Sequence, residues 1–191
     1  MNDAKCDPAG RLLAGTMAFD ASPHSAALYR VEPDWSFAQI VRDATQSNGI
    51  AWSPSGSRMY FIDSATQGVD VFDYDVDTGS ASNRRRLVTI DPAHGVPDGM
   101  AADAKGNLWV ACFGGAAVRC YSPAGVLLDE IFFPVTQVTS CAFGGPGLAD
   151  LYVTSAAYRL SAGQLKKEPH AGATFICRPG EEGMPASSFA G

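Results

Sequence analysis

Four polar residues open four similar segments of the chain, and their side chains are of types that bind metal ions. Each is followed by a short strand and a turn, with a glycine eight positions on, and the fourth segment is a looser copy of the others. The four residues are Asn2, Asn48, Asp98 and Thr139, and the glycines are Gly10, Gly56, Gly106 and Gly147. Carboxamide and carboxylate oxygens suit hard or borderline divalent cations such as Ca²⁺, Mg²⁺ or Mn²⁺, and Zn²⁺ also binds oxygen ligands plus water. The recurrence favours a shared site, although Asn-Gly and Asp-Gly, taken singly, are common turn dipeptides.

Short strands have to position these residues. Runs rich in Tyr, Val, Phe and Ile alternate with Gly, Pro, Asp and Ser turns, which is the pattern of an all-β chain. No window of helical length keeps an apolar stripe with a period of 3.6 residues without a Gly or Pro inside it. The runs with the strongest strand pattern are 59–62, 69–72, 108–111 and 151–153.

The spacing of the four segments indicates a β-propeller. Their starts are separated by 46, 50 and 41 residues, and units of about 40–50 residues with several short strands are typical of propeller blades. A two-sheet sandwich would not produce such a register. We predict a single domain over residues 1–191 with about four blades of four strands. With the first strand of each unit innermost, the four polar residues would ring one mouth of the channel.

Other motifs add little chemistry. Residues 73–79 resemble a calcium loop but lack the Gly and Glu that an EF-hand needs at positions six and twelve, so we expect a strand ending in a turn. Motifs for a serine nucleophile or a bound nucleotide are absent from the sequence. The run Arg84 to Arg86 is interpreted as a solvated hairpin tip. His94 lies four residues before Asp98 and could act as a base, but a solvated loop histidine is the simpler interpretation.

Composition narrows the class of protein. A net charge of −6 over 191 residues argues against nucleic-acid binding. No apolar run is long enough to span a membrane, and the first residues lack the apolar core of a signal peptide, so a cytoplasmic location is expected. Trp35, Trp52 and Trp109 are predicted to be core or blade-packing residues. The five cysteines show no C-x-x-C pair, which favours reduced thiols over a zinc or redox site.

Several stretches resemble one protein family. They are Asn48-Gly-Ile-Ala-Trp-Ser-Pro-Ser-Gly, Phe72-Asp-Tyr-Asp, Val96-Pro-Asp-Gly-Met, Gly106-Asn-Leu-Trp-Val-Ala, Thr139-Ser-Cys-Ala-Phe-Gly-Gly and Phe189-Ala-Gly. The chain is similar throughout to the senescence marker protein / gluconolactonase / luciferin-regenerating enzyme family. This resemblance implies a β-propeller of the six-bladed type that holds one divalent metal ion (Ca, Zn, Mn or Mg) and hydrolyses sugar lactones.

The resemblance also implies roles for individual residues. Asn48 and Asp98 match two of the three metal ligands of the family, and Asp98 matches its proposed general base. Asn2 matches the Asn of an Arg-x-Asn pair that contacts substrate, and Asp20 matches an acidic substrate-binding residue. The metal-binding Glu and the Arg of that pair have no match in these 191 residues.

Three functions are therefore compared. The first is a metal-dependent sugar lactonase of the gluconolactonase type, with activity reduced by the missing Glu and Arg. The second is a calcium-binding regulatory propeller without turnover, and the third is a scaffold propeller that binds protein partners. A partial propeller would expose two unpaired sheet edges, so self-association is also expected.

Overall fold

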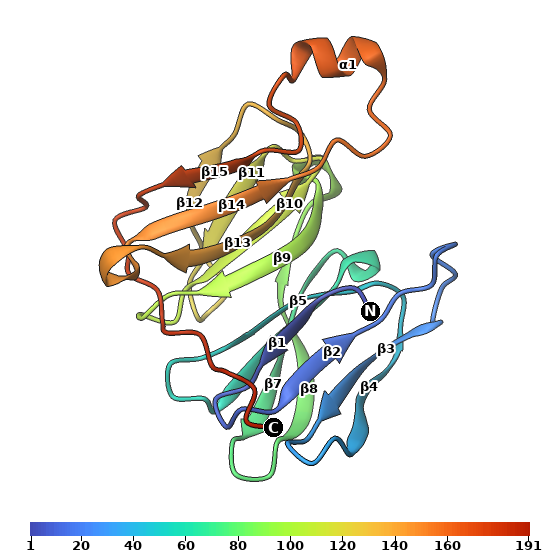
Figure 1. Cartoon of the computed structure of the whole chain (residues 1–191), viewed down its shortest axis with the longest axis vertical. Coiled ribbons are helices and arrows are strands. Elements are labelled where there is room, and N and C mark those ends of the chain that lie inside the picture. The colour runs from blue at the N-terminus through green and yellow to red at the C-terminus, as the bar shows by residue number, and fades with distance from the viewer. The chain divides into compact units, whose positions relative to one another are not determined.

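Fifteen β-strands, all paired antiparallel, form four separate sheets (Figure 1). The computed structural model describes residues 1–191. They divide into two units: unit 1 comprises Met1–Thr89 with Pro185–Gly191, and unit 2 comprises Ile90–Met184. Each unit contains two sheets built from consecutive strands. That these units form a single domain stays a prediction.

Unit 1 consists of two four-stranded sheets, each in the order of the sequence. The first contains β1 (Ala4–Cys6), β2 (Leu12–Gly15), β3 (Ala26–Val31) and β4 (Phe37–Ala44). The second contains β5 (Ser47–Trp52), β6 (Arg58–Asp63), β7 (Gly68–Asp75) and β8 (Ser80–Thr89). Strands β1 and β5, the first of each sheet, contact one another.

Unit 2 has one four-stranded and one three-stranded sheet. The first contains β9 (Val96–Ala102), β10 (Leu108–Phe113), β11 (Ala117–Tyr121) and β12 (Leu127–Phe132). The second contains β13 (Val138–Gly144), β14 (Asp150–Ser155) and β15 (Thr174–Cys177). Strand β13 packs against β9 and β10. First strands thus meet within each unit, as the prediction of innermost first strands requires.

Glycine shapes the turn after the first strand in three sheets. Gly10, Gly56 and Gly106 have φ of 84°, 73° and 84°, a region that residues with a Cβ rarely adopt. Each glycine donates its backbone N–H to the carbonyl three residues earlier, at 2.8–3.0 Å. The recurring glycine therefore has a conformational cause, and the predicted register is confirmed at the level of the backbone.

The cores follow the alternation of the strands. In unit 1 the buried cluster includes Leu13, Leu28, Ile50, Met59 and Phe61. In unit 2 it is centred on Trp109, with residues such as Val118, Val138, Leu151 and Val153. Alternate positions of each strand face these clusters, because successive side chains point to opposite faces of a sheet.

The predicted strands 59–62, 69–72, 108–111 and 151–153 are confirmed, and three details are corrected. The run Arg84 to Arg86 lies inside β8, not at a hairpin tip, since Arg84 and Arg86 both pair with the buried Asp70 on β7. Trp35 is 69% exposed and packs edge-on against Phe189 rather than in the core. The last sheet has three strands instead of four.

Helices are few. Besides three 3-10 turns, η1 (Ser64–Thr66), η2 (Pro92–His94) and η3 (Pro146–Leu148), there is one short α-helix, α1 (Ala162–Lys167). Ser161 and Gln164 form a capping box at its start, a local signal that the sequence prediction missed. None of these helices has the length and apolar character that crossing a bilayer demands.

Candidate functional site

The predicted polar residues occupy irregularities at the start of the first strands. Asn48 and Gly49 together oppose Ile62 between the pairs Ser47–Asp63 and Ile50–Phe61. Asp98 and Gly99 likewise oppose Ala111, and Thr139 is an extra residue between paired positions of β13. Such β-bulges re-aim a side chain and are common beside active sites. The sequence had left open whether Asn-Gly and Asp-Gly were turns, and the structure places them in strands.

Asn2 sits in a comparable irregularity just before β1. Gly15 accepts a hydrogen bond from the backbone N–H of Asn2 at 2.8 Å and donates its own N–H to the carbonyl of Asp3, also at 2.8 Å. Two residues thus oppose one, as in a bulge. All four register positions therefore interrupt the regular ladder, which the sequence spacing alone did not reveal.

In unit 1 the structure brings Asn2 and Asn48 together. The Asn2 Nδ2 donates to Asn48 Oδ1 and to the Ser47 carbonyl, both at 2.8 Å. The Asn48 Nδ2 in turn donates to Ser64 Oγ at 2.7 Å, and Asn48 is only 5% exposed. Ser64 also belongs to this network. It lies 16 residues from Asn48, and no motif in the sequence indicates that the two side chains are in contact.

The polar capacity that remains in this network is on oxygen. Both protons of Asn2 Nδ2 are used, so its Oδ1 is the free end of the amide and acts as an acceptor. Asn48 Oδ1 receives one hydrogen bond and keeps a second lone pair. Next to it, the Ser47 Oγ is buried and has no hydrogen-bond partner.

Asp98 belongs to unit 2 and is half-buried in β9. The following Gly99 lies so close to β13 that a Cβ there would be 2.9 Å from the Ser140 Cα. A side chain at this position would force the strands apart. The Asp-Gly pair is therefore needed as a unit: Gly99 lets β9 and β13 approach, and the bulge directs Asp98.

Two of the predicted site positions, Thr139 and Asp20, have fewer features of a binding site. Thr139 shares a hydrogen bond of 2.8 Å with Thr154 on the neighbouring strand, and neither is a charged ligand. Asp20 lies in the exposed connection between β2 and β3, where its Oδ1 accepts a hydrogen bond from Ser22 N at 3.1 Å. Hydrogen bonding by Ser22 lowers the pKa of the Asp20 carboxyl, so it stays ionised near neutrality.

In each unit taken by itself, the candidate residue offers an oxygen of a type that suits a hard cation. Asn48 keeps a free lone pair on a carboxamide oxygen and Asp98 supplies a carboxylate, the ligand types that Ca²⁺ and Mg²⁺ prefer. No group of three or more His, Cys, Asp or Glu side chains gathers anywhere in residues 1–191.

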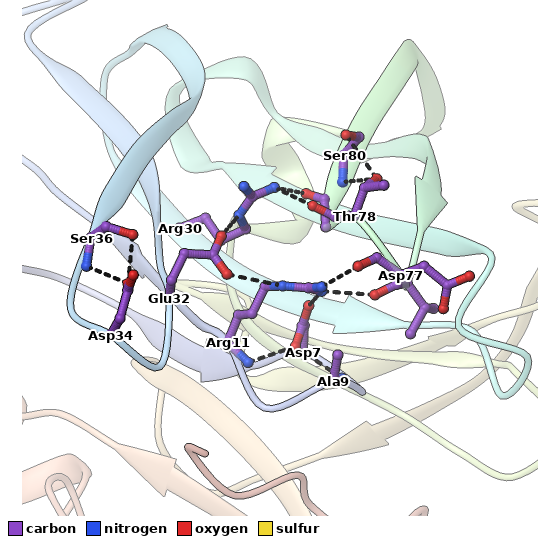
Figure 2. A network of polar contacts seen from close by, with 12 residues as sticks. Asp7, Ala9, Arg11, Arg30, Glu32, Asp34, Ser36, Asp77, Thr78 and Ser80 are labelled. Carbon is purple, nitrogen blue, oxygen red and sulfur yellow. Dashed lines mark hydrogen bonds and ion pairs between the residues drawn. The ribbon is translucent and has the colours of Figure 1, made fainter. Parts of the chain in front are cut away.

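The loop that resembles a calcium site is used differently (Figure 2). Arg11 donates to the carbonyl oxygens of Val76 and Asp77, and Arg30 donates to those of Thr78 and Gly79. Arg30 thus occupies the Gly79 carbonyl, which stands at the one position where a calcium loop would use a backbone oxygen. The prediction of a strand followed by a turn is confirmed, since β7 ends at Asp75.

The histidines do not form part of this arrangement. His94 is exposed in η2, and it is its backbone carbonyl rather than its ring that is engaged, accepting a hydrogen bond from Arg119. Cys112, Cys120 and Cys141 are buried, and burial raises the pKa of the Cys120 thiol to about 12. These thiols are therefore inert small core residues at neutral pH.

Comparison with known proteins gives a consistent answer. Residues 1–157 match the model of the "SMP-30/Gluconolactonase/LRE-like region". The chain is 44% identical to a regucalcin of Danio rerio over 100% of its length, and it spans 66% of that relative. The chain thus covers just under two thirds of the length of such curated relatives.

Solved structures agree with the fold. A luciferin-regenerating enzyme superposes on 98% of the chain with a TM-score of 0.90 and 40% identity, with 64% of that enzyme covered. A regucalcin of Agrobacterium tumefaciens, described as a calcium-binding protein, gives a TM-score of 0.93 at 28% identity over 98% of this chain and 64% of its own. The predicted all-β propeller class, here with four blades, is confirmed.

Proposed function

The chain belongs to the SMP-30/gluconolactonase/LRE-like family. We propose that it acts as a metal-dependent sugar lactonase that hydrolyses an aldonolactone such as gluconolactone. The observation that carries this proposal is the set of bulges that present Asn48 and Asp98, with Asn2 bonded to Asn48. Bulges re-aim side chains and are common next to active sites, which supports a binding role for the residues that they present.

We assign the metal-binding role to Asn48 and Asp98, each through one side-chain oxygen, with water completing the coordination. When bound, the cation would withdraw electron density from the lactone carbonyl. The free lone pair of Asn48 Oδ1 is the feature that makes its part of this assignment chemically consistent. The cation is Ca, Zn, Mn or Mg, and calorimetry distinguishes them.

Asp98 is proposed as the general base. It takes a proton from the attacking water, whose oxygen forms a bond to the carbonyl carbon while the ring C–O bond breaks and the released oxygen takes up a proton. The product is the open-chain hydroxy acid. Asn2 presents a carboxamide oxygen and Asp20 an ionised carboxylate, so both would accept hydrogen bonds from sugar hydroxyl groups.

The test is hydrolysis of gluconolactone by the chain, corrected for the spontaneous reaction, with and without a chelator and with each cation restored. We expect metal-dependent turnover that falls about 10²–10⁴-fold in Asp98→Ala, the range for removing a general base. The matched control is Asp129→Ala, which removes an exposed carboxylate of unit 2 on β12. Equal cation binding by wild type and Asp98→Ala in calorimetry would refute the assignment.

A calcium-binding protein without turnover is the second candidate. The donor set favours it, because Asn2, Asn48 and Asp98 offer oxygen and neither sulfur nor imidazole. The calcium-binding description of the A. tumefaciens relative agrees with it. Calcium binding that depends on Asp98, together with no lactone hydrolysis under any cation, would select this function over the first.

We also propose self-association through the outer edge of β15. The outermost strands of the other sheets carry charges, such as Arg42 on β4, Arg85 on β8 and Asp129 on β12, whereas Thr174 to Cys177 carry none. Charged residues protect sheet edges from pairing with another chain. Sedimentation should show an association that Ile176→Lys weakens, and a monomer at all concentrations would contradict it.

A further inference from the structure

Arg119 is a buried cation that bridges two separate parts of unit 2. Only 3% of its side chain is exposed on β11. Its Nε donates to Glu130 Oε2 at 2.7 Å, and Glu130 lies directly opposite on β12. Its Nη1 donates to the backbone carbonyl of His94 at 2.9 Å. When one guanidinium nitrogen of a buried arginine donates a hydrogen bond to a backbone carbonyl, that bond fixes the carbonyl in place.

The carbonyl that Arg119 holds belongs to the segment that leads into the Asp98 bulge. Asp91 caps η2 by accepting from Ala93 N at 2.9 Å, and Gly95 closes the turn by donating to the carbonyl of Pro92 at 3.1 Å. Gly95 has φ of 90°, and a Cβ there would lie 2.5 Å from Gly115 N. The segment 91–95 is thus pressed onto the turn between β10 and β11 and cannot shift freely.

Asp98 and Arg119 also share a neighbour. Cys112 on β10 is buried and lies opposite Pro97, the residue before Asp98. Burial raises the pKa of this thiol, Arg119 opposes that rise, and the charge of Asp98 adds to it. The charges of Arg119 and Asp98 thus act on the same thiol in opposite directions.

We propose that Arg119 is the positioning residue for Asp98: by holding the His94 carbonyl it fixes the segment that aims the bulged carboxylate. This rests on the proposed function in that Asp98 is taken as the base. Arginine suits the task because its planar fork donates in two directions at once and remains charged, whereas a lysine ammonium has one nitrogen to share between Glu130 and His94.

The experiment measures amide hydrogen exchange and lactone hydrolysis in the full chain for three variants. Arg119→Met removes both arms, Arg119→Lys keeps the charge, and Glu130→Gln removes the ion pair but leaves the bond to His94. We expect the amides of His94 and Gly95 to exchange at least about tenfold faster in Arg119→Met, because a lost hydrogen bond of about 1.4 kcal/mol is a factor of ten. Arg119→Lys should be intermediate and Glu130→Gln close to wild type.

Kinetics give the second readout. kcat should fall about 10- to 100-fold in Arg119→Met with KM nearly unchanged, since misdirecting a base affects the chemical step more than substrate binding. Unchanged exchange at His94 and Gly95 in Arg119→Met, or the same loss in Glu130→Gln, would overturn the proposal. A wild-type chain that never hydrolyses lactone would overturn the proposed function alone, and the exchange data would still decide whether Arg119 holds this segment.

Discussion

Polar residues at the two ends of a first strand differ in their hydrogen bonding. At one end is the bulge, with Asn48 in β5 and Asp98 in β9. Five residues later is the turn, where Asp103 follows β9 and Ser53 follows β5. In sequence the two positions look alike, since both recur with the same period and both favour Asp, Asn or Ser.

At the turn end, each carboxylate accepts four hydrogen bonds. Asp7 and Asp103 are both 0% exposed. In each, Oδ1 accepts the backbone N–H groups of the residues two and four positions on, at 2.7–3.0 Å. In each, Oδ2 accepts the side chain four positions on and one aromatic donor, which is the Tyr74 hydroxyl for Asp7 and the Trp109 indole for Asp103.

At the bulge end of unit 1, one side-chain oxygen keeps binding capacity. Asn48 keeps a lone pair on Oδ1, and Asp98 is half-buried rather than sealed in. A carboxylate with four donors has nothing left for a ligand, whereas an oxygen with a free lone pair does. Hydrogen-bond saturation, which the sequence does not show, separates Asp7 and Asp103 from Asn48, although all three are buried.

The largest expected effect is the loss of a saturated carboxylate. Asp103→Ala should lower the free energy of unfolding by about 3–5 kcal/mol, because it leaves several buried donors unpaired at about 1–3 kcal/mol each. Urea denaturation measures this. Asp98→Ala in the same assay should cost less than about 1 kcal/mol, since Asp98 is half-buried. Equal losses would erase the distinction between the two ends.

Tyr74→Phe removes one donor from the turn of the first sheet. The bond from its hydroxyl to Asp7 Oδ2 is 2.7 Å, and hydrogen bonds to charged groups contribute about 1.5–3 kcal/mol, so a loss in this range is expected at neutral pH.

The same residue makes stability depend on alkaline pH. Burial, together with Asp7, raises the pKa of Tyr74 above its ordinary value of about 10. Below pH of about 10 both states keep the phenol proton; above it the unfolded chain loses the proton first, so the free energy of unfolding falls as pH rises. Tyr74→Phe should make this fall shallower, with the part due to Tyr121, whose pKa burial raises to about 12, left in place. An unchanged slope would contradict the assignment.

Asn48→Ala tests the bulge end of unit 1. It removes an acceptor from Asn2 and a donor to Ser64, and we expect a loss of about 1–2 kcal/mol, less than at the turn because Asn2 is exposed and finds water instead. Thermal unfolding measures the cost, and cation titration should show weaker binding. Intact cation affinity would remove Asn48 from the proposed site.

Much of this organisation could be predicted from the sequence. The recurring polar residue and glycine marked the blades, because a turn with positive φ needs glycine and the repeat fixes its spacing. The contacts of Asn48 with Ser64 and of Arg119 with His94 could not be predicted, because they join residues 16 and 25 positions apart without a local pattern. Trp35 was misplaced because an aromatic residue carries no sign of which face it occupies.

The smallest expected effect concerns the turn that breaks the pattern. Ser53-Pro54-Ser55-Gly56 resembles Asp7-Pro8-Ala9-Gly10, so sequence alone suggests that Ser53→Asp would create a third saturated carboxylate. The backbone argues otherwise: Asp7 N bonds to the carbonyl four residues on, at 2.8 Å, whereas Ser53 N bonds to that of Arg58, five residues on, at 3.0 Å.

In this wider turn the Ser53 hydroxyl already serves Arg58 N at 3.1 Å, and the N–H four residues on is not aimed at it. We therefore expect Ser53→Asp to change the free energy of unfolding by no more than about 0.5 kcal/mol, as for an ordinary surface substitution. Denaturation beside wild type measures it. A gain of about 1 kcal/mol or more would show that a carboxylate by itself can close the turn one residue earlier, and that the side chain, rather than the backbone of the second sheet, sets the turn.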